Sequence, residues 1–179
     1  MSTFINILTL SRIFLAALIF ILLMSSDGYF LALVLFFVAG ITDYFDGYFA
    51  RKYNATSQLG EILDPIADKI LILFVLFGLA INLSSYLIGF IGATIITREI
   101  WVGALRDLNA RNGNSDVTKV TFLAKIKTTI QLFTISIYLF GLAINNMLII
   151  VIADIFLFIS LFITLYTGLI YSLNSFKLK

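Results

Sequence analysis

Four aspartates gather in one short stretch of an otherwise apolar chain, DYFDGYFARKYNATSQLGEILDPIADK, residues 43–69. They are Asp43, Asp46, Asp64 and Asp68. Ionised carboxylates repel one another in poorly solvated surroundings, and burying them without partners is costly. Protonation or a bound cation relieves that cost, and all-oxygen ligand sets suit hard ions such as Mg²⁺, Mn²⁺ or Ca²⁺. The stretch therefore indicates a carboxylate site for divalent metal ions.

Small residues and an arginine stand beside these acids. Gly47, Ala50 and Gly60 carry almost no side chain, which leaves room for a bulky ligand to approach the backbone. Arg51 adds a planar positive group suited to phosphate. Each residue alone is also compatible with an interfacial charge or a helix-packing contact. Their coordinated placement favours a phosphate-bearing ligand held through divalent metal, and two such ions can stabilise both attacking and leaving oxygens.

The composition places the chain in the membrane class. Of its 179 residues, 61% are hydrophobic and 12% are charged, whereas soluble domains carry about 25% charged residues. No linker rich in Pro, Gly or Ser divides it, so residues 1–179 are predicted to form a single domain. The chain has no cysteine and no histidine, which excludes disulfides, thiolate chemistry, a Ser-His-Asp triad and imidazole zinc sites. Its chemistry must use carboxylates, Lys, Arg, Tyr or hydroxyl groups.

Six segments are apolar and close to the length of about 20 residues that a transmembrane helix needs. They are Ile7–Met24, Phe30–Ala50, Leu59–Ile81, Tyr86–Leu105, Phe122–Ile144 and Met147–Leu173. The first lacks a basic leader and a clear small-residue cleavage site, so we expect it to be a retained span. The predicted fold is an all-α integral membrane protein with six transmembrane helices.

The basic residues indicate how these helices are oriented. The connections at residues 25–29, 82–85 and 145–146 contain no Lys or Arg, and with these spans all twelve basic residues fall on the other side. The positive-inside rule then places both termini and the aspartates on the cytoplasmic side. Asp154 falls in the last span away from that side, with no obvious basic partner.

Helix geometry brings the four aspartates together. A short connection makes the second and third spans antiparallel neighbours. Asp43 lies eight residues before Arg51, and Asp68 lies eight residues after Gly60, so both reach a depth on the order of 6–12 Å at 1.5 Å per residue. On each helix the acids and small residues share one face, within arcs of roughly 140° and 80°. Four carboxylates are thus predicted to converge on one volume.

The same residues form a recognisable motif. The pattern Asp43-x2-Asp46-Gly47-x2-Ala50-Arg51-x8-Gly60-x3-Asp64-x3-Asp68 resembles, without a gap, the signature of the CDP-alcohol phosphatidyltransferases, and the six-span layout agrees with that family's fold. The resemblance implies that the four aspartates carry two divalent cations, Mg²⁺ or Mn²⁺, and that Asp68 is also the base that deprotonates the acceptor alcohol. It implies contacts to CDP-diacylglycerol from Gly47, Ala50, Arg51, Ser57, Gly60, Asn6 and Thr9.

Three further stretches are similar to those of one branch of this family, the bacterial phosphatidylglycerophosphate synthases. They are NILTLSR (6–12), TREIWVGALRD (97–107), which opens with an Arg-Glu pair, and KIKT (125–128). The similarity implies that sn-glycerol 3-phosphate is the acceptor. Basic side chains partly below the interface suit its phosphate, although such residues also serve as snorkelling anchors. The candidates are Arg98, Arg106, Lys125, Lys127 and Arg12.

The predicted function is transfer of the phosphatidyl group of CDP-diacylglycerol to sn-glycerol 3-phosphate, giving phosphatidylglycerophosphate and CMP. The resemblance also implies a homodimer in the bacterial cytoplasmic membrane with its active site facing the cytoplasm; the lipid bilayer is a partner and nucleic acid is not. Three alternatives stay open: another acceptor such as inositol phosphate, a divalent-cation transporter, and a purely structural membrane protein. Clustering of the acids at one membrane face argues against a transport route.

Overall fold

The computed structural model describes residues 2–53, 58–114 and 122–176, and within these ranges every regular element is a helix. The elements are α1 (Ser2–Leu22), the 3-10 turn η1 (Ser26–Gly28), α2 (Tyr29–Tyr53), α3 (Gln58–Asn82), α4 (Tyr86–Arg111), α5 (Phe122–Ala143) and α6 (Met147–Phe176). Each α-helix overlaps one predicted segment, with ends that differ by up to six residues. The prediction of an all-α chain is confirmed.

Four helical segments have the length and apolar composition of a membrane span: Ser26–Phe45, Tyr86–Arg111, Phe122–Ala143 and Met147–Phe176. The apolar part of α1 is shorter and covers Asn6–Leu22. The first half of α3 carries Asp64, Asp68 and Lys69, which lowers its mean hydropathy. The chain is therefore a multi-pass membrane protein, and spanning by α1 and α3 stays a prediction.

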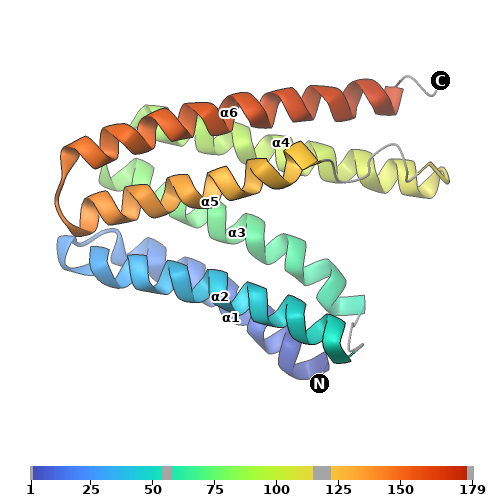
Figure 1. The fold of residues 1–179 in the computed structure, drawn as a ribbon, viewed down its shortest axis with the longest axis horizontal. Helices are drawn as coiled ribbons and strands as arrows, with labels where there is room; N and C mark the ends of the chain where they lie inside the picture. The colour runs from blue at the N-terminus through green and yellow to red at the C-terminus, as the bar shows by residue number, and fades with distance from the viewer. Residues whose placement is uncertain (1, 54–57, 115–121, 177–179) are drawn as a thin grey trace.

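The helices form two groups of three. α1 packs against α2 and α3, while α6 packs against α4 and α5. Contacts of α3 with α4 and of α2 with α5 join the groups. Successive helices run antiparallel, so the chain enters α1 and leaves α6 at the same end of the bundle (Figure 1). The two groups diverge toward that end, where α2 ends, α3 begins and α4 ends (Figure 1).

Tight turns close the opposite end. Ser84 and Asn145 adopt left-handed backbone conformations with φ of 49° and 52°, which reverses the chain just after α3 and α5. The hydroxyl oxygen of Ser85 then accepts a hydrogen bond from the N–H of Ile88 and caps the start of α4. These turns stand where the sequence predicted connections at 82–85 and 145–146.

The closed end also holds the main apolar core. Buried residues from all six helices form one continuous cluster, which includes Leu23, Phe36, Leu79, Ile91, Tyr138 and Leu157. Asn82, the last residue of α3, contacts the chain just after α1 and the start of α2. Its amide donates to the carbonyl of Leu23 and to the hydroxyl of Tyr29, both at 2.7 Å. This contact holds the connection between α1 and α2 against the end of α3.

Asp154 finds its partner within this packing. The hydroxyl of the fully buried Tyr138 donates to its Oδ1 at 2.6 Å, joining α5 to α6. This hydrogen bond gives the Asp154 carboxyl group a polar partner, which lipid could not supply.

A methyl group at Gly28 should destabilise the closed end. A Cβ there would lie 2.3 Å from the backbone carbonyl oxygen of Leu22, so the η1 turn would have to move. We expect Gly28→Ala to lower the free energy of unfolding by about 1–3 kcal/mol, measured as denaturation in detergent. Gly89→Ala is the matched control, because its Cβ would meet only Ala80 at an ordinary 3.7 Å. Equal stability of the two variants would contradict the prediction.

Candidate active site

Three of the four motif aspartates meet at one arginine. Asp43 on α2 and Asp68 on α3 each accept a hydrogen bond from one terminal nitrogen of Arg12, both at 2.6 Å. Asp64 accepts from the other terminal nitrogen at 3.3 Å. The hydroxyl of Thr9, one turn before Arg12 on α1, donates to the same Asp64 oxygen at 2.7 Å. Carboxylates from two helices thus converge on a group carried by a third, and we call Asp43, Asp64 and Asp68 with Arg12 the aspartate cluster.

Burial and charge make this cluster unusual for the inside of a membrane protein. Arg12 is completely buried, since α1 packs against both α2 and α3. The three carboxylates around it are each about half exposed. One guanidinium cannot balance three ionised carboxylates, so the cluster keeps a negative excess that can attract further cations.

The donor set of the cluster is entirely oxygen, as hard divalent ions require. The described Asp and Glu side chains include no ready-formed group of three that could hold a metal ion. Their oxygens nonetheless face one common cation, the Arg12 guanidinium. The cluster therefore fits a divalent ion in two respects: its donor atoms are all oxygens, and its three carboxylates point toward one positive group.

The other predicted residues of this site belong to α1, α2 and α3, apart from Ser57. Gly47 is half-buried on α2, Gly60 is buried in the first turn of α3, and Asn6 is half-buried on α1. Asp46, Ala50 and Arg51 belong to α2. Their side chains, and Ser57 as a whole, lie outside the part of the chain that the structure describes.

A cavity of about 180 Å³ adjoins the cluster between α3, α4 and α5. Asp68 belongs to its lining, together with the basic residues Lys69, Arg106 and Lys127 and the acidic Glu99. The other lining residues are Pro65, Ile72, Ile95, Ile96, Val102, Gly103, Thr128 and Gln131. Asp68 is thus common to the aspartate cluster and to a cavity whose charged lining is mostly basic.

Local helix periodicity explains this lining. On α4 the residues Glu99, Gly103 and Arg106 follow one another at spacings of four and three, which places them on one face. On α3 the same spacing puts Asp68 and Ile72 together. The cavity is built where these faces meet the first turns of α5.

The five basic residues predicted to bind the acceptor phosphate separate in space. Lys127 and Arg106 line the cavity. Arg12 lies in the aspartate cluster instead, and Lys125 is exposed on α5 and is not part of the lining. Arg98 is buried behind the cavity wall and is not part of the lining either.

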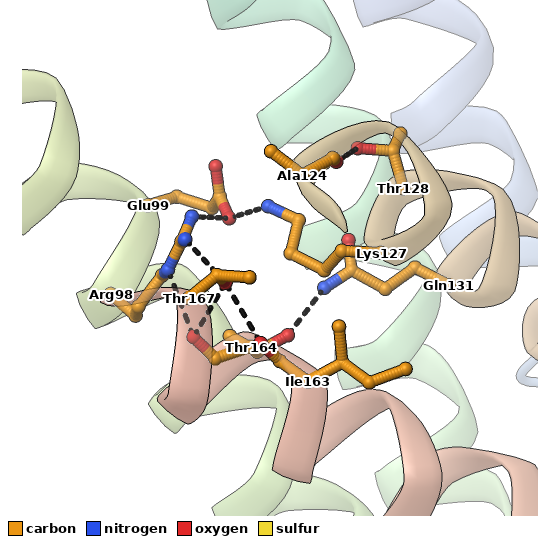
Figure 2. Close-up of polar contacts among 9 residues, drawn as sticks. All are labelled: Arg98, Glu99, Ala124, Lys127, Thr128, Gln131, Ile163, Thr164 and Thr167. Carbon is orange, nitrogen blue, oxygen red and sulfur yellow. Dashed lines mark hydrogen bonds and ion pairs between the residues drawn. The ribbon is translucent and has the colours of Figure 1, made fainter. Parts of the chain in front are cut away.

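Arg98 anchors α4 to α6. Its Nε donates to the carbonyl of Thr164 at 3.1 Å, and one terminal nitrogen donates to the hydroxyl of Thr167 at 2.6 Å (Figure 2). Gly168 makes room for it, because a Cβ there would lie 3.0 Å from Cγ of Arg98. The guanidinium lies 5.7 Å from the ring centroid of Tyr171. These contacts fit a cation that serves the packing of two helices.

Sequence reasoning missed two charged residues of the cavity, Glu99 and Lys69. The sequence does carry a signal for Glu99, because an acid inside a predicted span is functional by default. Its carboxylate accepts hydrogen bonds from both Arg98 and Lys127 (Figure 2). Lys69 lies one residue after a motif aspartate, and only the packing of α3 against α4 brings it to the cavity.

Comparisons with known proteins agree with this arrangement. The chain is 36% identical over 107 residues to the proteins called CDP-diacylglycerol–glycerol-3-phosphate 3-phosphatidyltransferase in Escherichia coli strain K12, Escherichia coli O157:H7 and Shigella flexneri serotype 5b. The aligned part covers 60% of this chain and 59% of each relative, so the chain matches about three-fifths of their length. The family model of the CDP-alcohol phosphatidyltransferases matches residues 3–166. With nearly the whole chain matched and three of the four motif aspartates converging in space, the protein belongs to the CDP-alcohol phosphatidyltransferase family.

Proposed function

We propose that this protein transfers the phosphatidyl group of CDP-diacylglycerol to sn-glycerol 3-phosphate, releasing CMP and forming phosphatidylglycerophosphate. The main observation behind the proposal is that Asp68 belongs both to the aspartate cluster and to the lining of the cavity. This carboxylate contacts Arg12 in the aspartate cluster and also lines the cavity with Arg106 and Lys127. A nucleotide lipid at the cluster and a phosphorylated alcohol in the cavity would therefore meet at Asp68.

The lining of the cavity supports a small anionic acceptor. Three basic residues face it against two acidic ones. Nε of Arg106 is buried and makes no hydrogen bond to any described residue, while its guanidinium stacks 5.4 Å from the ring centroid of Tyr171. A buried donor without a partner is costly unless a ligand completes it. Guanidinium and ammonium groups are the usual partners of phosphate.

These positions support the following proposed reaction. The acceptor phosphate binds Arg106 and Lys127, which directs a hydroxyl of the acceptor toward Asp68. Asp68 takes the proton of that hydroxyl as its oxygen forms a bond to the phosphorus that carries the diacylglycerol. The bond between this phosphorus and the bridging oxygen breaks, and CMP leaves with that oxygen as part of its phosphate. With no histidine in the chain, a carboxylate is a reasonable base for this step.

Asp43, Asp46, Asp64 and Asp68 are the residues that would hold divalent cations. Such ions, when bound, supply positive charge to the diphosphate of the nucleotide lipid. Asn6, Thr9, Gly47, Ala50, Arg51, Ser57 and Gly60 complete the proposed CDP-diacylglycerol site. Thr9 already donates to Asp64, so it would also orient that carboxylate.

We further place the chain in the bacterial cytoplasmic membrane, as one domain with six spans and with the aspartates facing the cytoplasm. The start of α1, the end of α2, the start of α3 and the end of α6 lie at one end of the bundle (Figure 1), which supports this orientation. Asp43 and Asp46 belong to the last part of α2, and Asp64 and Asp68 belong to the first half of α3. Assembly as a homodimer stays a prediction.

The deciding experiment is CMP release by the detergent-purified protein supplied with CDP-diacylglycerol and Mg²⁺. Glycerol 3-phosphate, inositol phosphate, inositol and serine are tested in parallel. We expect release with glycerol 3-phosphate alone. Release with another alcohol would keep the aspartate site and overturn the acceptor. Absence of release with all four, from folded and lipid-supplied protein, would overturn the proposed function and favour ion transport.

The cavity makes a separate prediction at Gly103. A Cβ at this position would meet Nζ of Lys69 at an ordinary 3.6 Å, but the larger side chain of leucine would enter the cavity. We expect Gly103→Leu to raise the KM for glycerol 3-phosphate at least about tenfold, equal to 1.4 kcal/mol, with a smaller change for CDP-diacylglycerol. Gly103→Ala is the control and should stay within about twofold of the wild type. Equal KM changes for the two substrates in Gly103→Leu would contradict this placement of the acceptor.

A further inference from the structure

Glu99 joins two buried cations and has no part in the chemistry proposed above. Its Oε1 accepts a hydrogen bond from a terminal nitrogen of Arg98 at 3.0 Å and another from Nζ of Lys127 (Figure 2). The side chain of Glu99 is 20% exposed, whereas those of Arg98 and Lys127 are 7% and 5% exposed. One carboxylate oxygen thus links α4 to α5 in a site that is largely closed.

The two cations differ in how they are held. Arg98 is fixed by Thr164 and Thr167 of α6 as well as by Glu99. Lys127 faces the cavity, and within the described part of the chain Glu99 is the acidic residue with which it forms an ion pair. A lysine ammonium is a point charge on a flexible stem with several rotamers. Its position at the cavity wall therefore depends on Glu99, whose own position depends on Arg98.

We propose that Glu99 is a positioning residue, which holds the ammonium of Lys127 at the cavity wall so that it meets the phosphate of the acceptor. This inference rests on the proposed function. An ammonium has three donors, and Glu99 accepts one of them, which leaves donors for a phosphate. The trio of Arg98, Glu99 and Lys127 keeps one net positive charge, so the carboxylate orients the lysine without cancelling the attraction for an anion.

A purely structural role is the rival explanation, in which Glu99 only compensates two buried charges. It predicts that loss of the carboxylate lowers stability and affects both substrates alike. Positioning predicts a selective effect on the acceptor, because CDP-diacylglycerol is assigned to the aspartate cluster. The two explanations therefore differ in which KM changes.

Steady-state kinetics of the full-length protein in detergent separate these outcomes. Glu99→Gln keeps the size of the side chain and removes its charge. We expect its KM for glycerol 3-phosphate to rise about tenfold, while kcat and the KM for CDP-diacylglycerol change by less than about twofold. Glu99→Asp restores the charge on a shorter stem and should recover part of the acceptor KM. Asp107→Asn, which removes an exposed carboxylate from the same helix, is the control and should match the wild type.

A double-mutant cycle with Lys127 tests whether Glu99 acts through that residue. In a Lys127→Met background, Glu99→Gln should add less than about twofold to the acceptor KM, since contacting residues are not additive. Additive effects would overturn the proposal, as would an acceptor KM that falls or stays unchanged in Glu99→Gln. Wild-type protein without glycerol 3-phosphate turnover would overturn the proposed function and, with it, the acceptor named here. Wild-type turnover with an unshifted KM in Glu99→Gln would overturn the role of Glu99 alone.

Discussion

Asp68→Asn should reduce turnover by about 10²–10⁴-fold, the usual contribution of a general base. Asparagine has nearly the same shape as aspartate, but its amide cannot take a proton from the acceptor hydroxyl. Asp68 is also where the aspartate cluster and the cavity meet, and no other described carboxylate of the cluster lines that cavity. The measurement is CMP release at saturating concentrations of both substrates, beside the binding of CDP-diacylglycerol.

Binding of the nucleotide lipid should change less than turnover, because Asp43 and Asp64 keep their places around Arg12. Asp27→Asn, at an exposed position in the η1 turn of the closed end, serves as the control and should behave like the wild type. If Asp68→Asn lost affinity for CDP-diacylglycerol by the same factor as turnover, Asp68 would act in lipid binding and its role as the base would be wrong.

Removal of divalent cations should abolish CMP release while leaving the protein folded. Divalent ions beside a transferring phosphate group contribute several kcal/mol to catalysis, because they stabilise the negative charge of the transition state. Their removal should therefore lower the rate by about 10²-fold or more. The fold should survive chelation, because the Arg12 guanidinium already contacts all three described carboxylates of the cluster. EDTA treatment followed by separate additions of Mg²⁺ and Mn²⁺ gives the activity, and thermal denaturation gives the stability.

Asp43→Asn tests whether a single aspartate of the cluster contributes to the binding of the metal ion. One carboxylate fewer should raise the Mg²⁺ concentration needed for half-maximal activity by about 10-fold or more, since affinity for hard cations depends on the charge of the ligands. Asp154→Asn is the matched control, because Asp154 pairs with Tyr138 far along the chain from the cluster. Full activity of the wild-type protein in excess EDTA would contradict the assignment of the aspartates to metal binding.

Much of the local structure could be predicted because it depends on neighbours in the chain. The connections at 82–85 and 145–146 coincide with the turns at Ser84 and Asn145. Asp43 and Asp68 were expected to face each other from two antiparallel helices, and both now contact Arg12. The fixed rise and rotation of an α-helix make such spacing arguments reliable within one hairpin.

The positions of the basic residues could not be predicted from helix spacing. Arg12, Arg98 and Lys127 were grouped because each carries charge near one side of the membrane. The structure separates them into the aspartate cluster, the α4–α6 contact and the cavity wall. Arg98 and Glu99 are adjacent in the chain, yet Arg98 reaches α6 and Glu99 reaches Lys127 on α5.

The sequence by itself determined the membrane class, the helices, the family motif and the convergence of Asp43, Asp64 and Asp68, because composition and helix periodicity are properties of the chain alone. Only the tertiary structure decided which cation lies among the carboxylates, which basic residues face the cavity, and that Glu99 joins Arg98 to Lys127. Those answers depend on which face of each helix meets which neighbour, and that choice is made by the packing of all six helices together.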